Sequence, residues 1–378
     1  MPFVLAFLAV VLALGIVQAA PVAERNLSLK NEVIRAEQKA VNWLAAQQNP
    51  EGWWSSADQP ALTALAVLAL QPHREEKGVA GKLARAYTFL ESCVKEDGSI
   101  YVKKELVNYN TALSLLAFLH SGEARHQPIV LRARKFLIGM QSDFGEKGRV
   151  DNVFDGGIGY GSRYQHSDLS NTMHALEAIF HSRQLAADAN EKQPDLNWAA
   201  PVAFIQACQN LPGYNKESWA SADQGNKGGF VYFPGHSMAG ETNLPSGKVA
   251  LRSYGSISYA GLLSYIYADV KRDDPRVQAV HNWLQENYSL EENPGMGEQG
   301  LFFYYHTMAK ALTALGVDQL DLKERGRVDW RRNLALKLLN LQSPEGFWVN
   351  KNARWWEKDP VLVTSYALLT LRRIEQQL

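Results

Sequence analysis

The sequence predicts an all-α protein, an (α/α)6 toroid in which six helix pairs form an inner and an outer ring. Three observations predict this fold. Segments with helical spacing of apolar residues recur along the 378-residue chain, and amphipathic segments alternate with almost wholly apolar ones. A turn of similar sequence occurs near both ends, QNPEGWW at 48–54 and QSPEGFW at 342–348. No alternating apolar and polar run is long enough to require a sheet.

The first helix of each pair is expected to be amphipathic. Each has an aromatic residue or Leu where it would pack inward, and four carry Gln near the C-terminal end. A helix with one apolar stripe keeps its other face in water, so these helices should form the outer ring. Their C-terminal parts are residues 40–48, 86–94, 133–141, 201–209, 280–288 and 335–342.

The second helix of each pair is apolar on nearly every face. Such a helix must be buried on every side, and six of them are most simply buried as an inner ring. They cover residues 61–70, 110–119, 171–180, 256–266, 306–315 and 363–371.

The turns between the paired helices are predicted to be structural. In QNPEGWW the Gln amide can bind backbone groups left open where a helix ends. Pro prevents further helix, Gly supplies a left-handed cap and Trp covers the gap between neighbouring pairs. We therefore expect the motif to join the rings rather than to catalyse a reaction.

These turns resemble the QW motif, Gln-x-x-x-Gly-x-Trp, of the terpenoid cyclase and protein prenyltransferase superfamily. The resemblance extends over about residues 33–375, and other repeats keep only the Gly or aromatic part, as in EDGSIY, GGIGYG and GGFVYF. Segments 251–261 and 292–307 are most similar to exported bacterial prenyltransferase/squalene oxidase repeat proteins, a branch with no assigned reaction. The full matches are Gln48, Gly52 and Trp54, and Gln342, Gly346 and Trp348.

The N-terminal segment indicates an exported protein, and the charge balance indicates that it has no polyanionic partner. Lys plus Arg and Asp plus Glu number 39 each, so nucleic acid is not expected as a partner. Residues 1–20 form an uncharged apolar run ending in small residues, as in a secretory signal peptide, with an uncleaved anchor as the alternative. We expect a single toroid domain over 24–378, in a secreted or periplasmic protein, and a membrane surface stays open as a partner.

The two cysteines, Cys93 and Cys208, are expected to be buried free thiols, because each lies in an apolar helical stretch. Neither has a second ligand nearby, so no metal site and no cofactor are expected.

A ligand cavity is expected between the inner helices. Connections 142–167 and 210–251 are far longer than ordinary helix–helix connections and are rich in Gly and aromatic residues. We expect both to fold over the mouth of the cavity.

The inner helices share a small hydroxyl residue, and Asn110, Asn171 and His306 directly precede it in three of them. Such a polar cluster in an apolar lining is what a ligand pocket needs. Further candidates lie within one helical turn, and the aromatic ones could stabilise a cationic intermediate. The shared hydroxyls are Thr63, Thr111, Thr172, Ser258, Thr307 and Ser365, and the further candidates are Arg252, Tyr254, Tyr259, Phe303, Tyr304 and Tyr305.

The segment Asp168-Leu-Ser170-Asn171-Thr resembles the Asp-x-Asp-Asp-Thr segment of squalene–hopene type cyclases. Its middle acid is replaced by Ser170, whose hydroxyl is far too weak an acid to protonate an alkene. Proton-initiated cyclisation therefore requires the proton to come from Asp168. A helix N-cap is the structural alternative for this residue.

Two other chemistries of related toroids fit less well. Tyr305-His306-Thr307 is similar to the zinc-ligand segment of protein prenyltransferases, but Ser256 and Ser258 stand where Asp and Cys are needed. The segment GMGEQ at 295–299 is similar to a thioester motif, but its Met cannot form a thioester.

Three classes of function remain open. The first is an isoprenoid-handling enzyme or binder with an apolar or amphipathic ligand. The second is a polysaccharide lyase-like enzyme acting on a glycan through Asn171, His306, Arg252 and Tyr304 or Tyr305. The third is a non-catalytic scaffold in the cell envelope that binds through its long connections.

Overall fold

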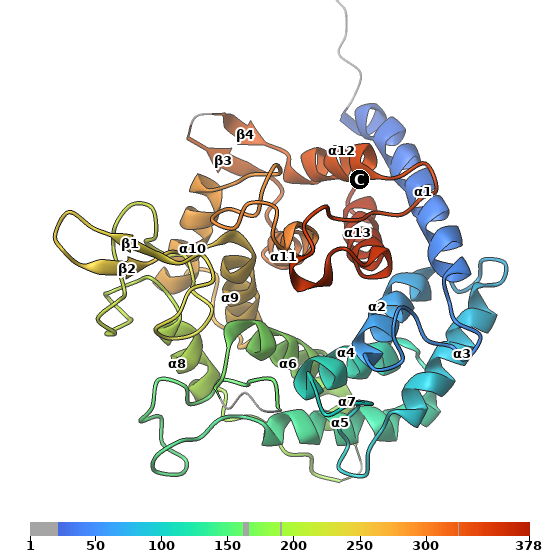
Figure 1. Cartoon of the computed structure of the whole chain (residues 1–378), viewed down its shortest axis with the longest axis horizontal. Helices are drawn as coiled ribbons and strands as arrows, with labels where there is room; N and C mark the ends of the chain where they lie inside the picture. Colours follow the sequence, from blue (N-terminus) through green and yellow to red (C-terminus); the bar gives the residue numbers. More distant parts are fainter. Residues whose placement is uncertain (1–21, 162–165, 190, 324) are drawn as a thin grey trace, which may run out of the picture.

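The structure is a computed structural model that describes residues 22–161, 166–189, 191–323 and 325–378. The predicted signal segment lies outside these residues. Two concentric rings of helices surround a central axis (Figure 1), as the sequence predicts. The first helix lies against the last helices of the chain, so the ring is closed by segments from opposite ends of the sequence.

Six helices form the inner ring, in the part of the chain described here. Each contacts the next in chain order, and α13 returns to α2. Their side chains are almost all buried, which explains why their sequences are apolar on every face. They are α2 (Pro60–Leu70), α4 (Val107–His120), α6 (Leu169–His181), α9 (Gly255–Tyr267), α11 (Leu301–Ala314) and α13 (Pro360–Glu375).

Within the described residues, six outer helices each precede their inner partner. They are α1 (Val22–Ala46), α3 (Val79–Ser92), α5 (Gln127–Gly139), α8 (Ala199–Ala207), α10 (Pro275–Glu286) and α12 (Trp330–Leu341). A short α7 (Arg183–Ala187) and the 3-10 turns Gln71–His73, Ala124–His126 and Arg354–Trp356 lie in connections.

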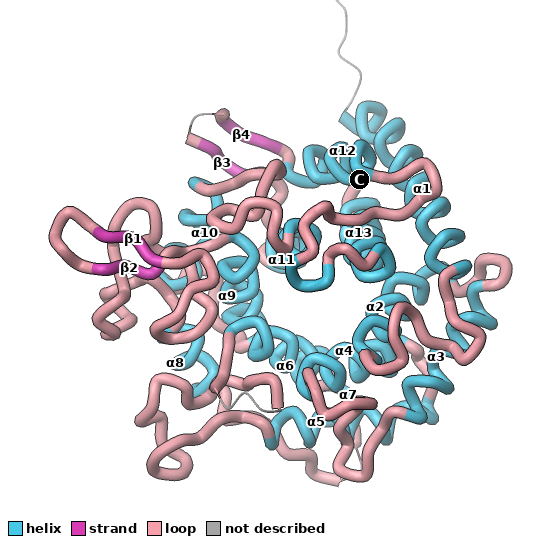
Figure 2. Tube along the Cα trace, in the orientation of Figure 1, coloured by secondary structure: helices cyan, strands magenta, loops and turns pink. Residues whose placement is uncertain are grey.

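Two small hairpins lie at the edge of the ring, where Figure 2 shows their strands in magenta. In the first, β1 (Glu241–Asn243) pairs antiparallel with β2 (Val249–Leu251), with Thr242 opposite Ala250. In the second, β3 (Leu320–Leu322) pairs antiparallel with β4 (Gly326–Val328). Strands of three residues are too short for the sequence pattern to reveal them.

The Gln residues that end outer helices join neighbouring pairs, as predicted. The Gln48 side-chain N–H donates to the carbonyls of Gly52, in its own turn, and Lys82, in the next outer helix, at 3.0 and 2.8 Å. Gln342 donates in the same way to Gly346 and to Ala36 of α1, at 3.0 and 2.9 Å. The second Gln therefore links the two ends of the chain.

The glycine of this turn is required by a close approach as well as by its backbone angle. Gly52 has φ of 101°, and a Cβ there would lie 2.4 Å from the Arg85 carbonyl oxygen of the next outer helix. Gly346 has φ of 102°, and its Cβ would lie 2.7 Å from the carbonyl oxygen of Lys39. A side chain at either position would push neighbouring pairs apart.

The shared hydroxyls of the inner helices hold the turns. In five pairs the hydroxyl oxygen accepts the backbone N–H of a turn residue, so these hydroxyls are structural. The pairs are Trp54–Thr63, Ile100–Thr111, Ile158–Thr172, Phe230–Ser258 and Trp348–Thr364, at 2.9–3.1 Å.

Two hydroxyls differ from the predicted alignment. In the sixth pair the residue is Thr364, not Ser365, because one residue along a helix is a rotation of about 100°. Ser365 instead donates to the Val361 carbonyl at 2.8 Å. In the fifth pair Thr307 donates within its own helix, to the Phe303 carbonyl at 2.9 Å.

Cys93 and Cys208 are buried free thiols, as predicted. Among the residues described, no helix is long and apolar enough to cross a membrane.

Candidate functional site

A cavity of about 280 Å³ lies where the N-terminal turns of the inner helices meet. Its lining is mainly aromatic and aliphatic, and every inner helix or the residue just before it contributes. The lining residues are Gln59, Ala61, Leu62, Leu106, Tyr109, Tyr160, Ser170, Asn171, His174, Tyr232, Met238, Tyr254, Ser256, Ile257, Phe303, Trp355, Trp356, Glu357, Leu362 and Tyr366.

Both long connections contribute to this lining, as the sequence predicts. Tyr160 comes from connection 142–167, and Tyr232 and Met238 come from connection 210–251. The hydroxyls of Tyr160 and Tyr232 are 2.8 Å apart, so a hydrogen bond joins the two connections beside the cavity.

A third connection, before α13, also reaches the cavity and was not predicted. Its Trp355 and Trp356 are 40% and 51% exposed and have φ of 52° and 67°. Residues other than Gly are strained in this left-handed region, by about 1–2 kcal/mol each. Arg354 lies over the Trp355 ring, 5.2 Å from its centroid. The strained turn therefore places two exposed tryptophans in the lining of the cavity.

Glu357, the next residue, is the one carboxyl group among the described lining residues. It is 1% exposed and binds the N-terminus of α11. Its Oε1 accepts the N–H of Phe303 at 2.8 Å, and its Oε2 accepts the N–H of Phe302 at 3.3 Å and an amide N–H of Asn350 at 2.6 Å. Burial raises the pKa of this carboxyl, and these hydrogen bonds oppose the rise.

The sequence does not single out Glu357, because a single acidic residue in a turn looks like a solvated charge. A weak signal was present, since the acid directly follows two tryptophans before an inner helix. Its burial depends on the fold of the turn, and sequence spacing does not specify that fold.

Asp168 is the N-cap of α6, which was the structural alternative for this residue. Its Oδ1 accepts the Asn171 backbone N–H at 2.9 Å, and its Oδ2 accepts the Asn171 amide at 2.8 Å. Burial raises its pKa to about 6, against hydrogen bonds from Asn171 and Tyr232. Asp168 is outside the lining, whereas Asn171 and Tyr232 belong to it.

The predicted candidates divide between the cavity and its surroundings. Asn171, Tyr254 and Phe303 line the cavity. Asn110 lies outside the lining and caps the neighbouring inner helix, because its Oδ1 accepts the Ala61 N–H at 2.9 Å. Arg252 is exposed and is not a lining residue.

The other candidate tyrosines point away from the cavity. The Tyr304 hydroxyl donates to the Ser289 carbonyl at 3.0 Å, and the Tyr305 hydroxyl donates to the Leu290 carbonyl. Tyr259 is fully buried, with its ring 5.6 Å from that of Tyr304. None of the three lines the cavity.

Four side chains form a layer across the inner ring, which we call the polar floor: Tyr109, His174, His306 and Tyr366. Tyr109, His174 and Tyr366 line the cavity, and His306 stacks on Tyr366 with ring centroids 5.3 Å apart. The Tyr109 and Tyr366 hydroxyls are 3.2 Å apart, and the Tyr109 and His174 rings meet edge to face at 4.9 Å.

The two histidines of the polar floor are neutral near pH 7. Burial lowers the pKa of His174 to about 4 and lowers that of His306 well below its usual value. The Nδ1 atom of each is buried and has no hydrogen-bond partner.

A buried ion pair joins α6 and α11. The Lys310 ammonium is 2.5 Å from the Glu177 carboxylate, and both side chains are less than 10% exposed. Burial favours the neutral acid, but Lys310 outweighs it and lowers the pKa of Glu177 to about 2. This pair is electrically neutral as a whole, so it adds no net charge beside the polar floor.

No group of three or more His, Cys, Asp or Glu residues in the described parts of the chain is placed to hold a metal ion.

The fold has counterparts among solved structures. The chain is similar to the type II terpene cyclase MstE from Scytonema, with 14% identity, a TM-score of 0.55, and coverage of 92% of this chain and 99% of that one. A variant of the same cyclase bound to geranylgeranyl dihydroxybenzoate gives 12% identity and 0.52, covering 93% and 99%. No protein-family model and no curated protein sequence matches.

A second enzyme class shares the fold. An inactive variant of the α-1,6-mannanase of Salegentibacter sp. HEL1_6, in complex with α-1,6-mannotriose, has 11% identity and a TM-score of 0.51, and covers 92% of this chain and 99% of that one. These likenesses define the chain as an α/α toroid, the architecture of both enzymes.

Proposed function

We propose that this protein binds an isoprenoid-type molecule in the cavity and acts on it as a terpenoid cyclase-like enzyme, with Glu357 as the proton donor. The observation that carries the proposal is the placement of one buried carboxyl group in a lining of aromatic and aliphatic side chains. Apolar lining favours an apolar ligand, and the aromatic rings can stabilise a carbocation.

The surroundings of Glu357 suit an acid that must protonate an alkene. Burial keeps the carboxyl protonated more readily than in water, which is the form that donates. The N–H groups of Phe302 and Phe303 and the N-terminus of α11 stabilise the carboxylate left after donation. Burial therefore keeps the carboxyl group protonated before the reaction, and the N–H groups stabilise the carboxylate once the proton has left.

The proposed step conserves protons and electrons. The carboxylic acid gives its proton to one carbon of an alkene, so a C–H bond forms, the π bond breaks and the other carbon becomes a cation. A second alkene of the same molecule attacks that cation and closes a ring. The final cation loses a proton to water, and Glu357 is protonated again from water, with no net oxidation or reduction.

The mannanase likeness supports the glycan alternative less well. Glycosidases of the usual kind need two carboxyl groups beside the scissile bond. Glu357 stands alone among the described lining residues, because Asp168 lies behind Asn171 and Tyr232. Arg252, on which the lyase hypothesis depends, is exposed outside the cavity.

The test is incubation of the protein with farnesol, geranylgeraniol and squalene, with extraction and mass spectrometry of products. We expect a cyclic isomer from at least one substrate, and none from the Glu357→Gln variant. Asp359→Asn is the matched control, because Asp359 also caps an inner helix, accepting the Val361 N–H at 2.8 Å, but does not line the cavity. Substrate recovered unchanged from the unmodified protein would contradict the proposal, as would cleavage of α-1,6-mannotriose.

A further inference from the structure

The polar floor has hydrogen-bonding capacity that the protein itself does not use. The Tyr109 and Tyr366 oxygens share one hydroxyl hydrogen, so the hydrogen of the other hydroxyl is left for another acceptor. The Nδ1 atoms of His174 and His306 are buried without a partner. The Nε2 atom of His174 also lacks a protein partner among the described residues and, unlike Nδ1, is not fully buried, so a molecule in the cavity can reach it as well as the free tyrosine hydrogen.

The floor carries no net charge. His174 and His306 are neutral near pH 7, and burial keeps the Tyr109 and Tyr366 hydroxyls protonated, with the pKa of Tyr109 raised to about 12. None of the described lining residues is Lys or Arg. A diphosphate or another multiply charged head group would enter without a counter-ion, at a large desolvation cost.

We propose that the polar floor is a binding subsite for an uncharged oxygen function, a hydroxyl or a carbonyl, at one end of the otherwise apolar ligand. A hydroxyl both donates and accepts, so it can take the free hydrogen of the tyrosine pair and bind the Nε2 of His174, the ring nitrogen that is not fully buried. The subsite rests on the proposed function only in requiring that an isoprenoid-type ligand enters the cavity.

This subsite has a consequence for substrate class. The ligand is a prenyl alcohol or a related carbonyl compound, rather than a prenyl diphosphate or a pure hydrocarbon. The floor lies about one turn of α11 below the bonds that Glu357 makes to Phe302 and Phe303, a rise of roughly 5 Å. The oxygen end is therefore held close to the proton donor.

The test compares the binding of three probes of equal chain length: farnesol, farnesene and farnesyl diphosphate, measured by quenching of tryptophan fluorescence and by calorimetry. We expect farnesol to bind about tenfold or more tightly than farnesene, since hydrogen bonds to a buried polar site discriminate on this scale. Farnesyl diphosphate should bind most weakly.

Two variants test whether the tyrosine hydroxyls of the polar floor cause the preference for farnesol over farnesene. In Tyr109→Phe/Tyr366→Phe both rings stay and both hydroxyls are lost, so farnesol should lose its advantage while farnesene binding is unchanged. Tyr265→Phe is the control, because its buried hydroxyl lies on α9 and binds Gln209 Oε1 at 3.0 Å, outside the cavity. It should keep the full preference.

The outcomes separate the two proposals. Equal binding of farnesol and farnesene, tighter binding of the diphosphate, or a preference that persists in the double variant would overturn the subsite but leave an apolar cavity. Binding of none of the three probes would overturn the subsite and the proposed function together.

Discussion

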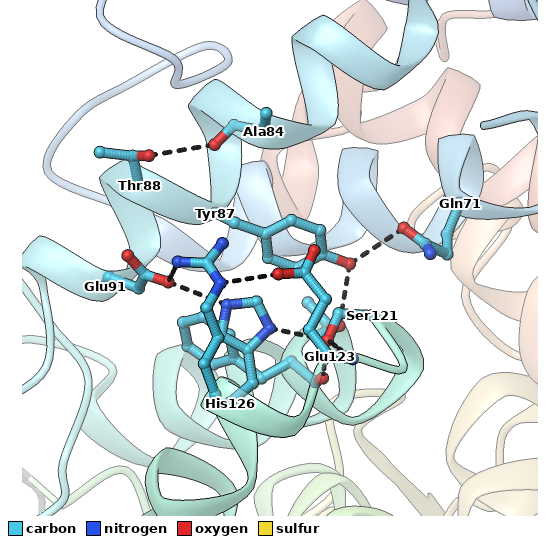
Figure 3. Close-up of polar contacts among 11 residues, drawn as sticks. Gln71, Ala84, Tyr87, Thr88, Glu91, Ser121, Glu123 and His126 are labelled. Carbon is cyan, nitrogen blue, oxygen red and sulfur yellow. Dashed lines mark hydrogen bonds and ion pairs between the residues drawn. The ribbon is translucent and has the colours of Figure 1, made fainter. Parts of the chain in front are cut away.

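Two regions of the molecule bury histidine in opposite ways. The first, shown in Figure 3, is the histidine clamp: His126, Glu91 and Ser121. The His126 Nδ1 is 2.7 Å from Ser121 Oγ, and its Nε2 is 2.8 Å from Glu91 Oε1. Every polar atom of this imidazole has a partner, and the side chain ties the connection after α4 to α3.

The clamp has the residue types of a hydrolase triad but not the required geometry. The Ser121 hydroxyl donates to the Phe118 carbonyl at 2.7 Å, where α4 ends, so its hydrogen is not available to His126. Ser121 is also 3% exposed and lies outside the cavity. The histidine clamp therefore has a structural role and is not a catalytic triad.

The polar floor differs in one respect that matters. His174 and His306 are also buried, but each leaves Nδ1 without a partner, and the floor borders a cavity. Full pairing indicates a structural role, and incomplete pairing beside a cavity indicates a role toward a ligand.

Removal of the acid gives the largest effect. Glu357→Gln should lower turnover by about 10²–10⁴-fold, the usual contribution of a general acid, while farnesol binding changes little. Steady-state kinetics with product analysis measures the first, and fluorescence quenching measures the second. A variant that keeps its rate would show that the proton comes from elsewhere, with Asp168, which binds the lining residue Asn171, as the next candidate.

The same substitution in the two histidine regions should have opposite consequences. His126→Phe loses a buried hydrogen bond to Ser121 and a partly buried one to Glu91, so we expect a loss of about 2–4 kcal/mol in the free energy of unfolding. His174→Phe removes an unpaired nitrogen, so its stability should change by less than ~1 kcal/mol. Urea unfolding measures both variants.

Farnesol binding completes that comparison. It should weaken in His174→Phe and stay unchanged in the folded fraction of His126→Phe. If His174→Phe destabilised the protein as much as His126→Phe, the floor would be a structural element like the clamp.

The pH dependence of the free energy of unfolding tests the burial of His174. His174 has a folded pKa of about 4 against an ordinary 6.5, so the unfolded chain binds more protons between these values. Its contribution to stability is full above pH 6.5 and falls as pH drops toward 4, by roughly 3 kcal/mol for a shift of this size. Unfolding across pH 4–7 should show a smaller loss of stability in His174→Phe than in wild type, and not its absence, because His306 also has a lowered pKa and is kept in the variant.

Asp168 acts in the opposite sense over nearly the same window. Its folded pKa of about 6 lies above its ordinary value of 3.8, so its contribution is present below pH 3.8 and is lost as pH rises through 6. The wild-type curve therefore contains partly cancelling slopes. The difference between wild type and His174→Phe isolates the histidine, and parallel curves would contradict the assignment.

The smallest effect concerns the ring itself. Gln342→Ala removes one hydrogen bond to Ala36 of α1 and one to Gly346 within the turn, and should cost about 1–2 kcal/mol in the free energy of unfolding. Gln48→Ala should cost at least as much, because its amide makes the two equivalent bonds and its Oε1 also accepts an Arg85 N–H at 3.0 Å. Farnesol binding should not change in either variant, since neither Gln lines the cavity.

Much of the fold could be predicted because its signals are local and repeated. Helical periodicity identifies both rings, and the Gln, Gly and Trp of each complete turn act within the turn and its neighbour, as at Gln48 and Gly52. Asn171, Tyr254 and Phe303 could be placed near the cavity because they stand at the starts of inner helices.

The remaining lining residues depend on rotation and on turns. Tyr109, His174 and Tyr366 lie on helices apolar all round, and only the packing of the ring determines which face meets the axis. Glu357 follows two residues in a strained conformation that no spacing rule specifies. Asn110 also stands near the start of an inner helix, but its side chain caps a neighbouring helix and does not line the cavity.

The most direct test is a crystal structure of the protein with farnesol. We predict the chain of farnesol in the cavity and its oxygen within 2.7–3.2 Å, the normal range of a hydrogen bond, of the Tyr366 hydroxyl or the Nε2 of His174. Electron density for farnesol outside the cavity, or inside it with the oxygen directed away from the polar floor, would contradict the account.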